Sequence, residues 1–125
     1  MDTKGGRYTI KIGGTRYSGR GKATIKPARA VPKAEANRDG SGYRTVEPKL
    51  ASVELAFDRG PDDDRIRWTE GMLLDDVDVT FREDDVGVTH YWTKGSWNGE
   101  PSLDSDTGEV SGMSVMSDQY RSIAA

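Results

Sequence analysis

The feature that most constrains the fold is a strict two-residue alternation of side chains between residues 49 and 58. One set is Ala51, Val53, Leu55 and Phe57, and the opposite set is Ser52, Glu54, Ala56 and Asp58. Successive side chains of a β-strand point to opposite faces, whereas a helix repeats every 3.6 residues. The segment therefore predicts a strand that buries one face.

The same alternation predicts further strands elsewhere. They are expected at 7–12, 15–17, 22–26, 73–82, 88–97 and 109–117. Gly13-Gly14 is typical of a two-residue hairpin turn. Asn98-Gly99, followed by Pro101, predicts that the strand before it ends there. Residues 118–125 form a C-terminal tail with no clear pattern.

Two segments break the strand pattern. Residues 62–70 are expected to form one short helix, because Pro61 and the following aspartates are start signals and Gly71 is a stop signal. Residues 27–44 combine prolines and glycines with charges and carry almost no large apolar residue. Long loops of this kind are usually functional or disordered, so both an arm that reaches a neighbouring subunit and a flexible loop remain open.

These elements define one domain over residues 1–125 of mainly β class. We expect two packed antiparallel sheets, as in a β-barrel-like sandwich, with one short α-helix and a long protruding loop. Only 34% of the 125 residues are hydrophobic and 31% are charged. The core is thin for a domain of this size, so part of the apolar surface is expected to be buried between subunits.

Charge is divided unevenly along the chain. Residues 1–50 carry 12 Lys and Arg against 4 Asp and Glu, and residues 51–125 carry 6 against 17. A nucleic-acid-binding arm has this asymmetry, and so does a subunit whose one half meets the opposite half of its neighbour. A solvated surface with chance clustering is a third interpretation.

No pattern indicates catalysis, and we expect no enzyme, no metal and no cofactor. The chain has no cysteine, which excludes disulfides and thiolate metal sites. Its single histidine, His90, lies within an expected strand and is better explained as a structural residue than as a general base. No run approaches the roughly 18 apolar residues of a membrane span, and residues 1–7 do not resemble a signal peptide. We therefore expect no membrane partner.

The tryptophans leave two rival functions open. Trp68, Trp92 and Trp97 are most simply core or interface anchors. Together with the basic half, they would also suit a nucleic-acid-binding β-barrel module. Trp92 and Trp97 alone would suit a sugar-binding sandwich.

The order of seven segments carries a resemblance to a known family. These segments are 9–17, 40–44, 48–55, 76–81, 87–92, 95–101 and 108–111. In that order they resemble the bacteriophage tail tube proteins of the Mu-like contractile-tail (myovirus) type, over nearly the whole chain. The tube subunits of type VI secretion systems and tailocins are similar in architecture and stand as the alternative.

This resemblance implies a structural subunit whose main partner is itself. It implies homo-hexameric rings that stack into the inner tube of a phage tail, in the virion, after assembly in the host cytoplasm. It also implies a surrounding tail sheath protein, a tape-measure protein in the tube, and baseplate and tail terminator proteins at its ends. Double-stranded DNA would pass through the lumen without specific binding.

The implied tube assigns expected roles to charged residues. A conduit should not hold DNA, whose phosphates bind basic groups, so an acidic or neutral bore is expected. The candidates on polar strand faces are Glu54, Asp58, Asp76, Asp78 and Glu109. Candidates for contacts between subunits are the arm cations Arg29, Lys33, Arg38 and Arg44, their acidic partners Asp62, Asp63 and Asp64, and Trp68.

Overall fold

The computed structural model describes residues 1–60 and 66–124 and shows mainly β-structure in this part of the chain. The strands are β1 (Tyr8–Ile12), β2 (Thr15–Ser18), β3 (Thr24–Lys26), β4 (Ala30–Ala36), β5 (Gly42–Pro48), β6 (Ala51–Asp58), β7 (Val77–Glu83), β8 (Val88–Leu103), β9 (Glu109–Ser117) and β10 (Gln119–Ala124). The helix is α1 (Glu70–Leu74). It is too short to span a membrane, and no other helix in the described residues could do so.

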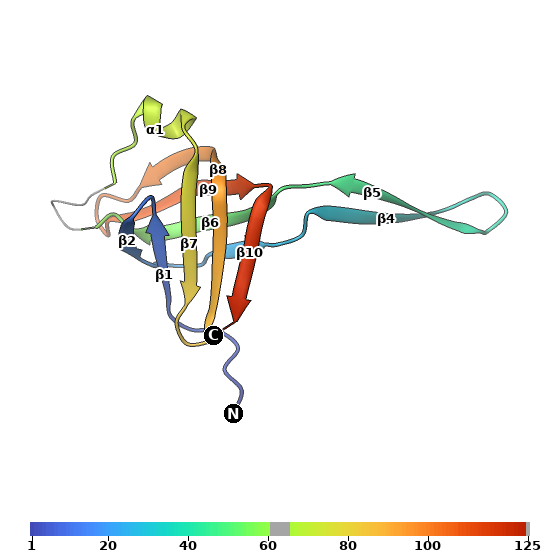
Figure 1. Ribbon diagram of the computed structural model, residues 1–125, viewed down its shortest axis with the longest axis horizontal. Helices are drawn as coiled ribbons and strands as arrows, with labels where there is room; N and C mark the ends of the chain where they lie inside the picture. The colour runs from blue at the N-terminus through green and yellow to red at the C-terminus, as the bar shows by residue number, and fades with distance from the viewer. Residues whose placement is uncertain (61–65, 125) are drawn as a thin grey trace.

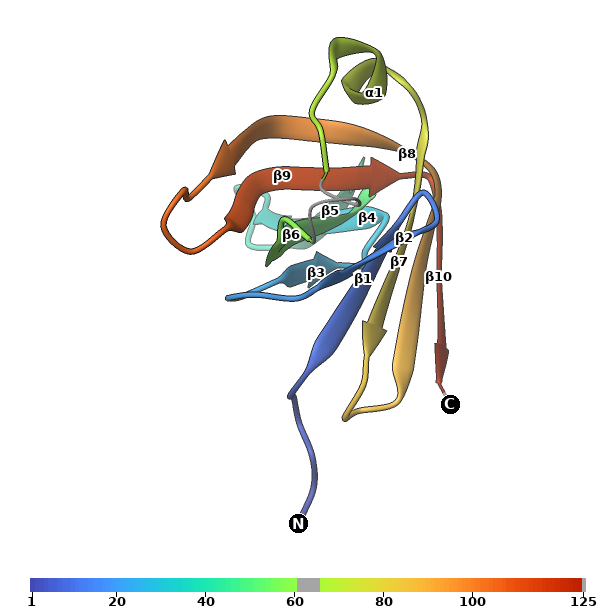
Figure 2. The ribbon, with the colours of Figure 1, turned by 90° about the vertical axis from the view of Figure 1, so that its left-hand side faces the viewer.

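The body of the molecule consists of two antiparallel sheets that share one strand (Figures 1 and 2). The first sheet has the order β2-β1-β7-β8-β10, and the second has the order β3-β6-β9-β8. The first half of β8 pairs with β7 and β10, and its second half pairs with β9. The expected sandwich is confirmed, and the described strands leave it open instead of closing it into a barrel.

The core lies between the inner faces of the two sheets. Its largest fully buried side chains are Trp92, Phe57, Ile10, Val53, Val79, Val110 and Val115. The predicted strand at β6 is confirmed, and Val53 and Phe57 are buried while Glu54 between them is exposed. Its opposite face is also partly covered, because Ser52 and Ala56 are buried. Full burial of large apolar side chains stabilises a fold by about 1.5–3 kcal/mol each, so the core layer accounts for the cohesion of the sandwich.

The expected protrusion is confirmed, and it is a hairpin instead of an irregular loop. Strands β4 and β5 pair along their whole lengths and project from the body (Figure 1). The hairpin extends to Pro48, four residues beyond the expected end at residue 44. At its tip, the N–H of Asn37 donates to the carbonyl of Ser41 at 2.7 Å, which closes the turn.

The helix lies later in the chain than predicted. Residues 66–69 are not helical, and the rest of the predicted start lies outside the described residues. The hydroxyl of Thr69 accepts a hydrogen bond from the N–H of Met72 at 3.2 Å, so Thr69 is the N-cap and the helix begins at Glu70. Gly71 therefore lies within the helix and does not end it. Leu73, predicted to lie in a strand, is also helical.

The predicted turn at Asn98-Gly99 was wrong, since β8 continues to Leu103. The pairing of β8 with β9 shifts register between Gly99 and Ser102, as in a β-bulge. A Cβ on Gly99 would lie 2.4 Å from the carbonyl oxygen of Gly112, so the glycine allows the strands to approach closely. Asn-Gly therefore marks a bulge here instead of a hairpin end.

The C-terminal tail also adopts a defined structure. Strand β10 pairs with the first half of β8 at the edge of the first sheet. The Tyr120 ring stacks on Trp92 with a centroid distance of 4.9 Å. This contact covers the core with a segment for which the sequence showed no clear pattern.

Candidate functional site

Two candidate carboxylates line a hollow on the outer face of the second sheet. Glu54, at the centre of β6, and Glu109, at the start of β9, border a hollow of about 480 Å³ above β6, β8 and β9. Glu54 is exposed and lies 3.9 Å from the ammonium of Lys26. The rest of the lining consists of Lys22, the apolar Leu55 and Met113, and small or polar residues such as Asn98 and Ser114. This face therefore combines acidic groups with a cation and short polar side chains.

A third candidate, Asp58, lies directly opposite Glu109 across the β6–β9 pair. Neither carboxylate has an ion pair with a described cation. Burial, and then the nearby Glu109, raise the pKa of the Tyr8 hydroxyl. Like charges directly opposite each other destabilise a sheet, so this pair would gain from an incoming cation.

The other two acidic candidates lie on the first sheet. Asp76 is exposed and immediately precedes β7. Asp78, within β7, accepts a hydrogen bond from the N–H of Lys94 at 2.9 Å. The five candidates therefore form two groups on different sheets, and Asp78 has a structural role in β8.

Among the arm candidates, the structure separates neutralised charges from unpaired ones. Lys33 forms an ion pair with Glu35 at 3.0 Å within the arm. Arg29 lies at the arm base, where its carbonyl accepts from the N–H of Lys49 at 2.8 Å, and Arg38 lies in the tip turn. Arg44 has no described ion-pair partner. The expected acidic partners Asp62, Asp63 and Asp64 lie outside the described residues.

Trp68 contacts the body of its own chain. Its ring meets that of Trp97 edge to face, with a centroid distance of 5.0 Å and an interplanar angle of 83°. Trp92 and Trp97 are buried, with 1% and 8% of their surfaces exposed. The two rings are therefore inaccessible to a sugar, which removes the basis of the sugar-binding alternative.

His90 belongs to a structural cluster at the edge of the first sheet. Its Nδ1 lies 2.6 Å from the Tyr120 hydroxyl, and its Nε2 lies 2.9 Å from a carboxylate oxygen of Glu83. These contacts join β10 to β8 and β7. No group of three or more potential metal ligands occurs in the part of the chain that the structure describes.

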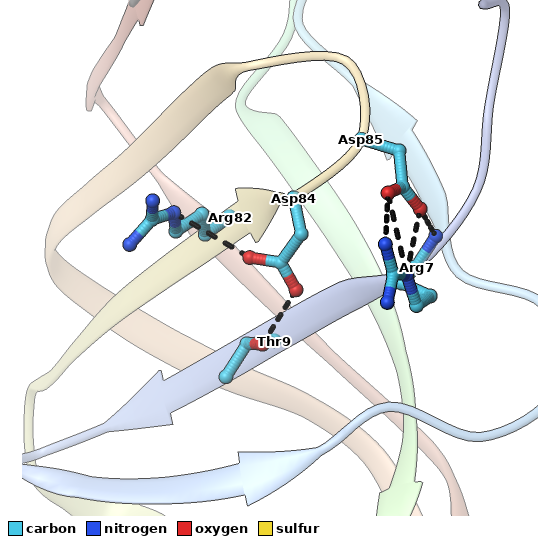
Figure 3. Close-up of polar contacts among 5 residues, drawn as sticks. All are labelled: Arg7, Thr9, Arg82, Asp84 and Asp85. Atoms are coloured by element: carbon cyan, nitrogen blue, oxygen red, sulfur yellow. Dashed lines mark hydrogen bonds and ion pairs between the residues drawn. The ribbon is translucent and has the colours of Figure 1, made fainter.

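A clamp between the N-terminal segment and the β7–β8 turn was not predicted (Figure 3). The Arg7 guanidinium donates to Asp85, with an Nη2–Oδ1 distance of 2.7 Å, and the backbone N–H of Arg7 donates to the same carboxylate at 2.6 Å. Asp84 accepts from the Thr9 hydroxyl at 2.9 Å and forms an ion pair with Arg82 at 3.4 Å. The hydrogen bonds from Arg7 lower the pKa of Asp85 to about 2. Only the register of β1 with β7 reveals these partners.

The outer face of the first sheet is basic, which also escaped prediction. Lys11, Arg16 and Arg82 line a hollow of about 220 Å³, together with Asp84 and Tyr91. They come from three neighbouring strands. The outer face of the first sheet therefore carries three cations beside Asp84, and that of the second sheet carries carboxylates and small polar groups beside Lys22 and Lys26.

Three solved structures with a similar fold come from an extracellular contractile injection system and from the anti-feeding prophage. One is the sheath/tube terminator of an extracellular contractile injection system, PVC, in the extended state, with a TM-score of 0.55, 12% identity and 94% of each chain covered. Another is the tube-terminating cap of the anti-feeding prophage, with a TM-score of 0.52, 13% identity, and 95% of this chain and 89% of that chain covered. A third is a chain of the PVC sheath-tube complex in the extended state, with a TM-score of 0.50, 13% identity, and 95% of this chain and 89% of that chain covered. At such identities the likeness concerns the fold.

The sequence itself also matches a family. The comparison with curated proteins finds no matching relative. A family model described as phage tail tube protein matches residues 1–122, which include the arm, both sheets and most of β10.

Proposed function

The chain belongs to the phage tail tube protein family, and from this premise we propose that it polymerises into stacked rings that form the inner tube of a contractile tail. It is a structural protein of the tail and not an enzyme. The family match over residues 1–122 is the observation that carries the proposal. The tube and terminator proteins of contractile injection systems, which share the fold, support it.

Polymerisation accounts for features that a monomer leaves unexplained. All residues of β4 and β5 are exposed, although isolated two-stranded hairpins are only marginally stable in water. The body also ends in edge strands, and such edges are usually covered or paired. Contacts with neighbouring subunits would provide both kinds of cover.

The bore must be built from several subunits. The space between the two sheets is filled by side chains such as Trp92 and Phe57, so one chain cannot enclose a duplex. We take six subunits per ring from the family resemblance, with double-stranded DNA passing through the ring at ejection. Sheath, tape-measure, baseplate and terminator proteins would be the other partners, and the tail would assemble in the host cytoplasm.

We further propose that the outer face of the second sheet lines this bore. That face presents three carboxylates (Glu54, Asp58 and Glu109) against two cations (Lys22 and Lys26), whereas the first sheet presents three cations (Lys11, Arg16 and Arg82) against Asp84. Basic groups would bind DNA phosphates and retard its passage. The basic face would then point outward, toward the sheath.

Electron microscopy tests the tube directly. Concentrated protein, alone and with sheared contractile tails as seeds, should give hollow tubes or rings in negative stain, with a mass per ring equal to six copies. Particles that remain monomeric under both conditions would contradict the proposal. A tube used by a tailocin or a type VI system would give the same images, so ejection of DNA needs a separate test with a genome-filled particle.

The lining of the bore is tested by charge substitution. Glu54→Lys should make assembled tubes retain short DNA duplexes at low salt, because it places a cation in the bore. Lys11→Glu, on the other sheet, is the control and should not change retention. The rival nucleic-acid-binding function predicts instead that the unassembled wild type binds DNA and that Lys11→Glu weakens this binding.

A further inference from the structure

The outer face of the first sheet gathers cations from three strands around one hollow. Lys11 of β1 lies directly opposite Arg16 of β2 and, on its other side, opposite Thr80 of β7. Arg82, two residues after Thr80 on β7, is a diagonal neighbour of Lys11. Diagonal neighbours on one face of a sheet lie within reach of each other's long side chains. The strand register therefore places three positive charges beside the same hollow of about 220 Å³.

Two of these three charges are not neutralised within the described chain. Lys11 and Arg16 are exposed, and neither forms an ion pair with a described residue. Like charges directly opposite each other destabilise a pair of strands. Strand β2 is the edge of the first sheet and pairs with β1 at only four positions. This strand pair would therefore gain stability from an anion bound between its two cations.

The carboxylate in the lining is already in use. Asp84 accepts a hydrogen bond from the Thr9 hydroxyl at 2.9 Å, and its other oxygen lies 3.4 Å from Nε of Arg82. Figure 3 shows both contacts, with the terminal nitrogens of Arg82 turned away from Asp84. Asp84 thus orients the Arg82 side chain, and the terminal nitrogens of Arg82 remain available to a ligand.

Hydroxyl groups complete the hollow on the side of β8. Thr80 lies opposite Tyr91, and Arg82 lies opposite Thr89. The hydroxyls of Thr80, Thr89 and Tyr91 line the hollow and form no hydrogen bond with a described residue. Each of these hydroxyls can donate one hydrogen bond. The hollow thus combines three cations with three available hydroxyls, and its lining is rich in donors.

We propose that this hollow is a binding site for a phosphate-class oxyanion, held by Lys11, Arg16 and Arg82. Guanidinium groups bind phosphate oxygens through two parallel hydrogen bonds, and a lysine ammonium adds a compact positive charge. A tetrahedral anion presents several acceptor oxygens to donors that converge from three strands. A small anion fits better than a nucleic acid, because the donors surround one hollow, whereas a duplex needs cations along its backbone. The site lies within one chain and is independent of the proposed tube.

Calorimetric titration of the unassembled protein with inorganic pyrophosphate tests the site, in chloride buffers of matched ionic strength. Arg16→Gln should weaken binding about tenfold or more, because it removes hydrogen bonds between charged groups, and Arg16→Lys should retain part of the affinity. Arg121→Gln is the matched control. Arg121 lies on the same sheet, with its guanidinium carbon 4.9 Å from the centroid of the Tyr91 ring, but does not line the hollow. Equal weakening by Arg16→Gln and Arg121→Gln would show that pyrophosphate responds only to net charge and would overturn the site.

Thermal unfolding tests whether the anion relieves the repulsion between the two cations. Without pyrophosphate, Arg16→Gln should melt at or above the temperature of the wild type, since the like charges no longer face each other. Pyrophosphate at about ten times its Kd should raise the Tm of the wild type by about 4–8 °C and that of Arg16→Gln much less. An equal rise in both proteins would place the stabilising effect elsewhere and contradict the proposal.

NMR titration locates the bound anion and identifies its source. The amide resonances of Lys11, Arg16 and Thr80 should shift as pyrophosphate is added, and those of the β4–β5 hairpin should not. Shifts spread over the whole chain would count against a defined site. Short duplex DNA at physiological ionic strength should not displace the pyrophosphate. Displacement by the duplex would assign this face to a nucleic acid backbone and overturn the small-anion site.

Discussion

The backbone N–H of Lys94 donates to Oδ1 of Asp78 at 2.9 Å, and this bond holds β8 at an irregularity beside β7. Lys94 has φ of 50°, in the left-handed region that costs a side-chain-bearing residue roughly 1–2 kcal/mol. Lys94→Gly should therefore raise the free energy of unfolding by about 0.5–1 kcal/mol, after allowing for the greater chain entropy of glycine. Urea unfolding measures this change. A lower stability for Lys94→Gly would show that the lysine side chain itself stabilises the fold.

Removing the acceptor of that hydrogen bond should change the free energy of unfolding in the opposite direction. Asp78→Ala leaves the Lys94 N–H without its carboxylate and should lower the free energy of unfolding by about 1 kcal/mol. Asp76→Ala, next to β7 but without a described side-chain hydrogen bond, is the matched control and should change stability little. Equal losses in the two variants would argue against the structural role of Asp78.

The clamp between Arg7 and Asp85 predicts a pH dependence. Hydrogen bonds from the Arg7 side chain and backbone lower the pKa of Asp85 from 3.8 to about 2. The stabilising effect is therefore complete above pH 4 and is lost as the pH falls through 2. Carboxyl NMR titration should locate this pKa, and Arg7→Ala should move it back toward 4. The urea midpoints of wild type and Asp85→Asn should differ at pH 7 and converge near pH 2.

Gly95 predicts a packing defect where β8 passes between the sheets. A Cβ at this position would lie 2.6 Å from Cγ1 of Val115 and 3.2 Å from the carbonyl oxygen of Val77. Gly95→Ala should thus lower the free energy of unfolding by about 1–3 kcal/mol, as other overpacked cores do. Gly42→Ala, in β5, is the matched control, because a Cβ there would lie 4.0 Å from the carbonyl oxygen of Glu35 and Gly42, like Gly95, is outside the left-handed region. Thermal unfolding with partial rescue by Val115→Ala would identify the clash.

The contacts of Tyr120 are expected to attach β10 to the rest of the first sheet. Its ring stacks on Trp92 and its hydroxyl contacts His90. Tyr120→Ala should lower the free energy of unfolding by about 2–3 kcal/mol and shift Trp92 fluorescence to longer wavelength. Tyr120→Phe keeps the ring and should cost only about 1 kcal/mol. Unchanged fluorescence in Tyr120→Ala would mean that β10 does not shield the core.

Local sequence patterns predicted those elements whose limits do not depend on the strand that pairs with them. The alternation of β6 and the turn at Gly13-Gly14 follow from period and backbone freedom alone. The end of β8 was wrong because Asn98-Gly99 has the same local signature in a bulge as in a hairpin, and only the partner strand distinguishes the two. The helix was misplaced because Thr69 provides the N-cap, and no local pattern distinguished it from the aspartates as a start signal. The structured β10 depends on a distant contact with Trp92.

For the candidate site, too, the sequence predicted local features but not those that depend on strand pairing. Its residue types were predictable from charge, but the meeting of Asp58 with Glu109 depends on the β6–β9 register. The separation of Asp78 from Glu54 depends on sheet order, which no local pattern encodes. The alternation of side chains assigns residues to the two faces of the β4–β5 hairpin only when the pairing of these strands is known. The sequence did not predict β4, because it contains Pro32 and proline is uncommon inside strands.

The sharing of β8 between both sheets has a mechanical consequence for the proposed tube. A pull on the arm enters the body through the paired strands β3 and β6 and passes by way of β9 into the second half of β8. Because β8 is one uninterrupted strand, the tension reaches β7 and β10 without crossing a loop. The ladders on either side of β8 carry this load in shear, with many hydrogen bonds strained at once. In the proposed tube, a subunit built in this way would resist mechanical unfolding by a force that acts on its arm.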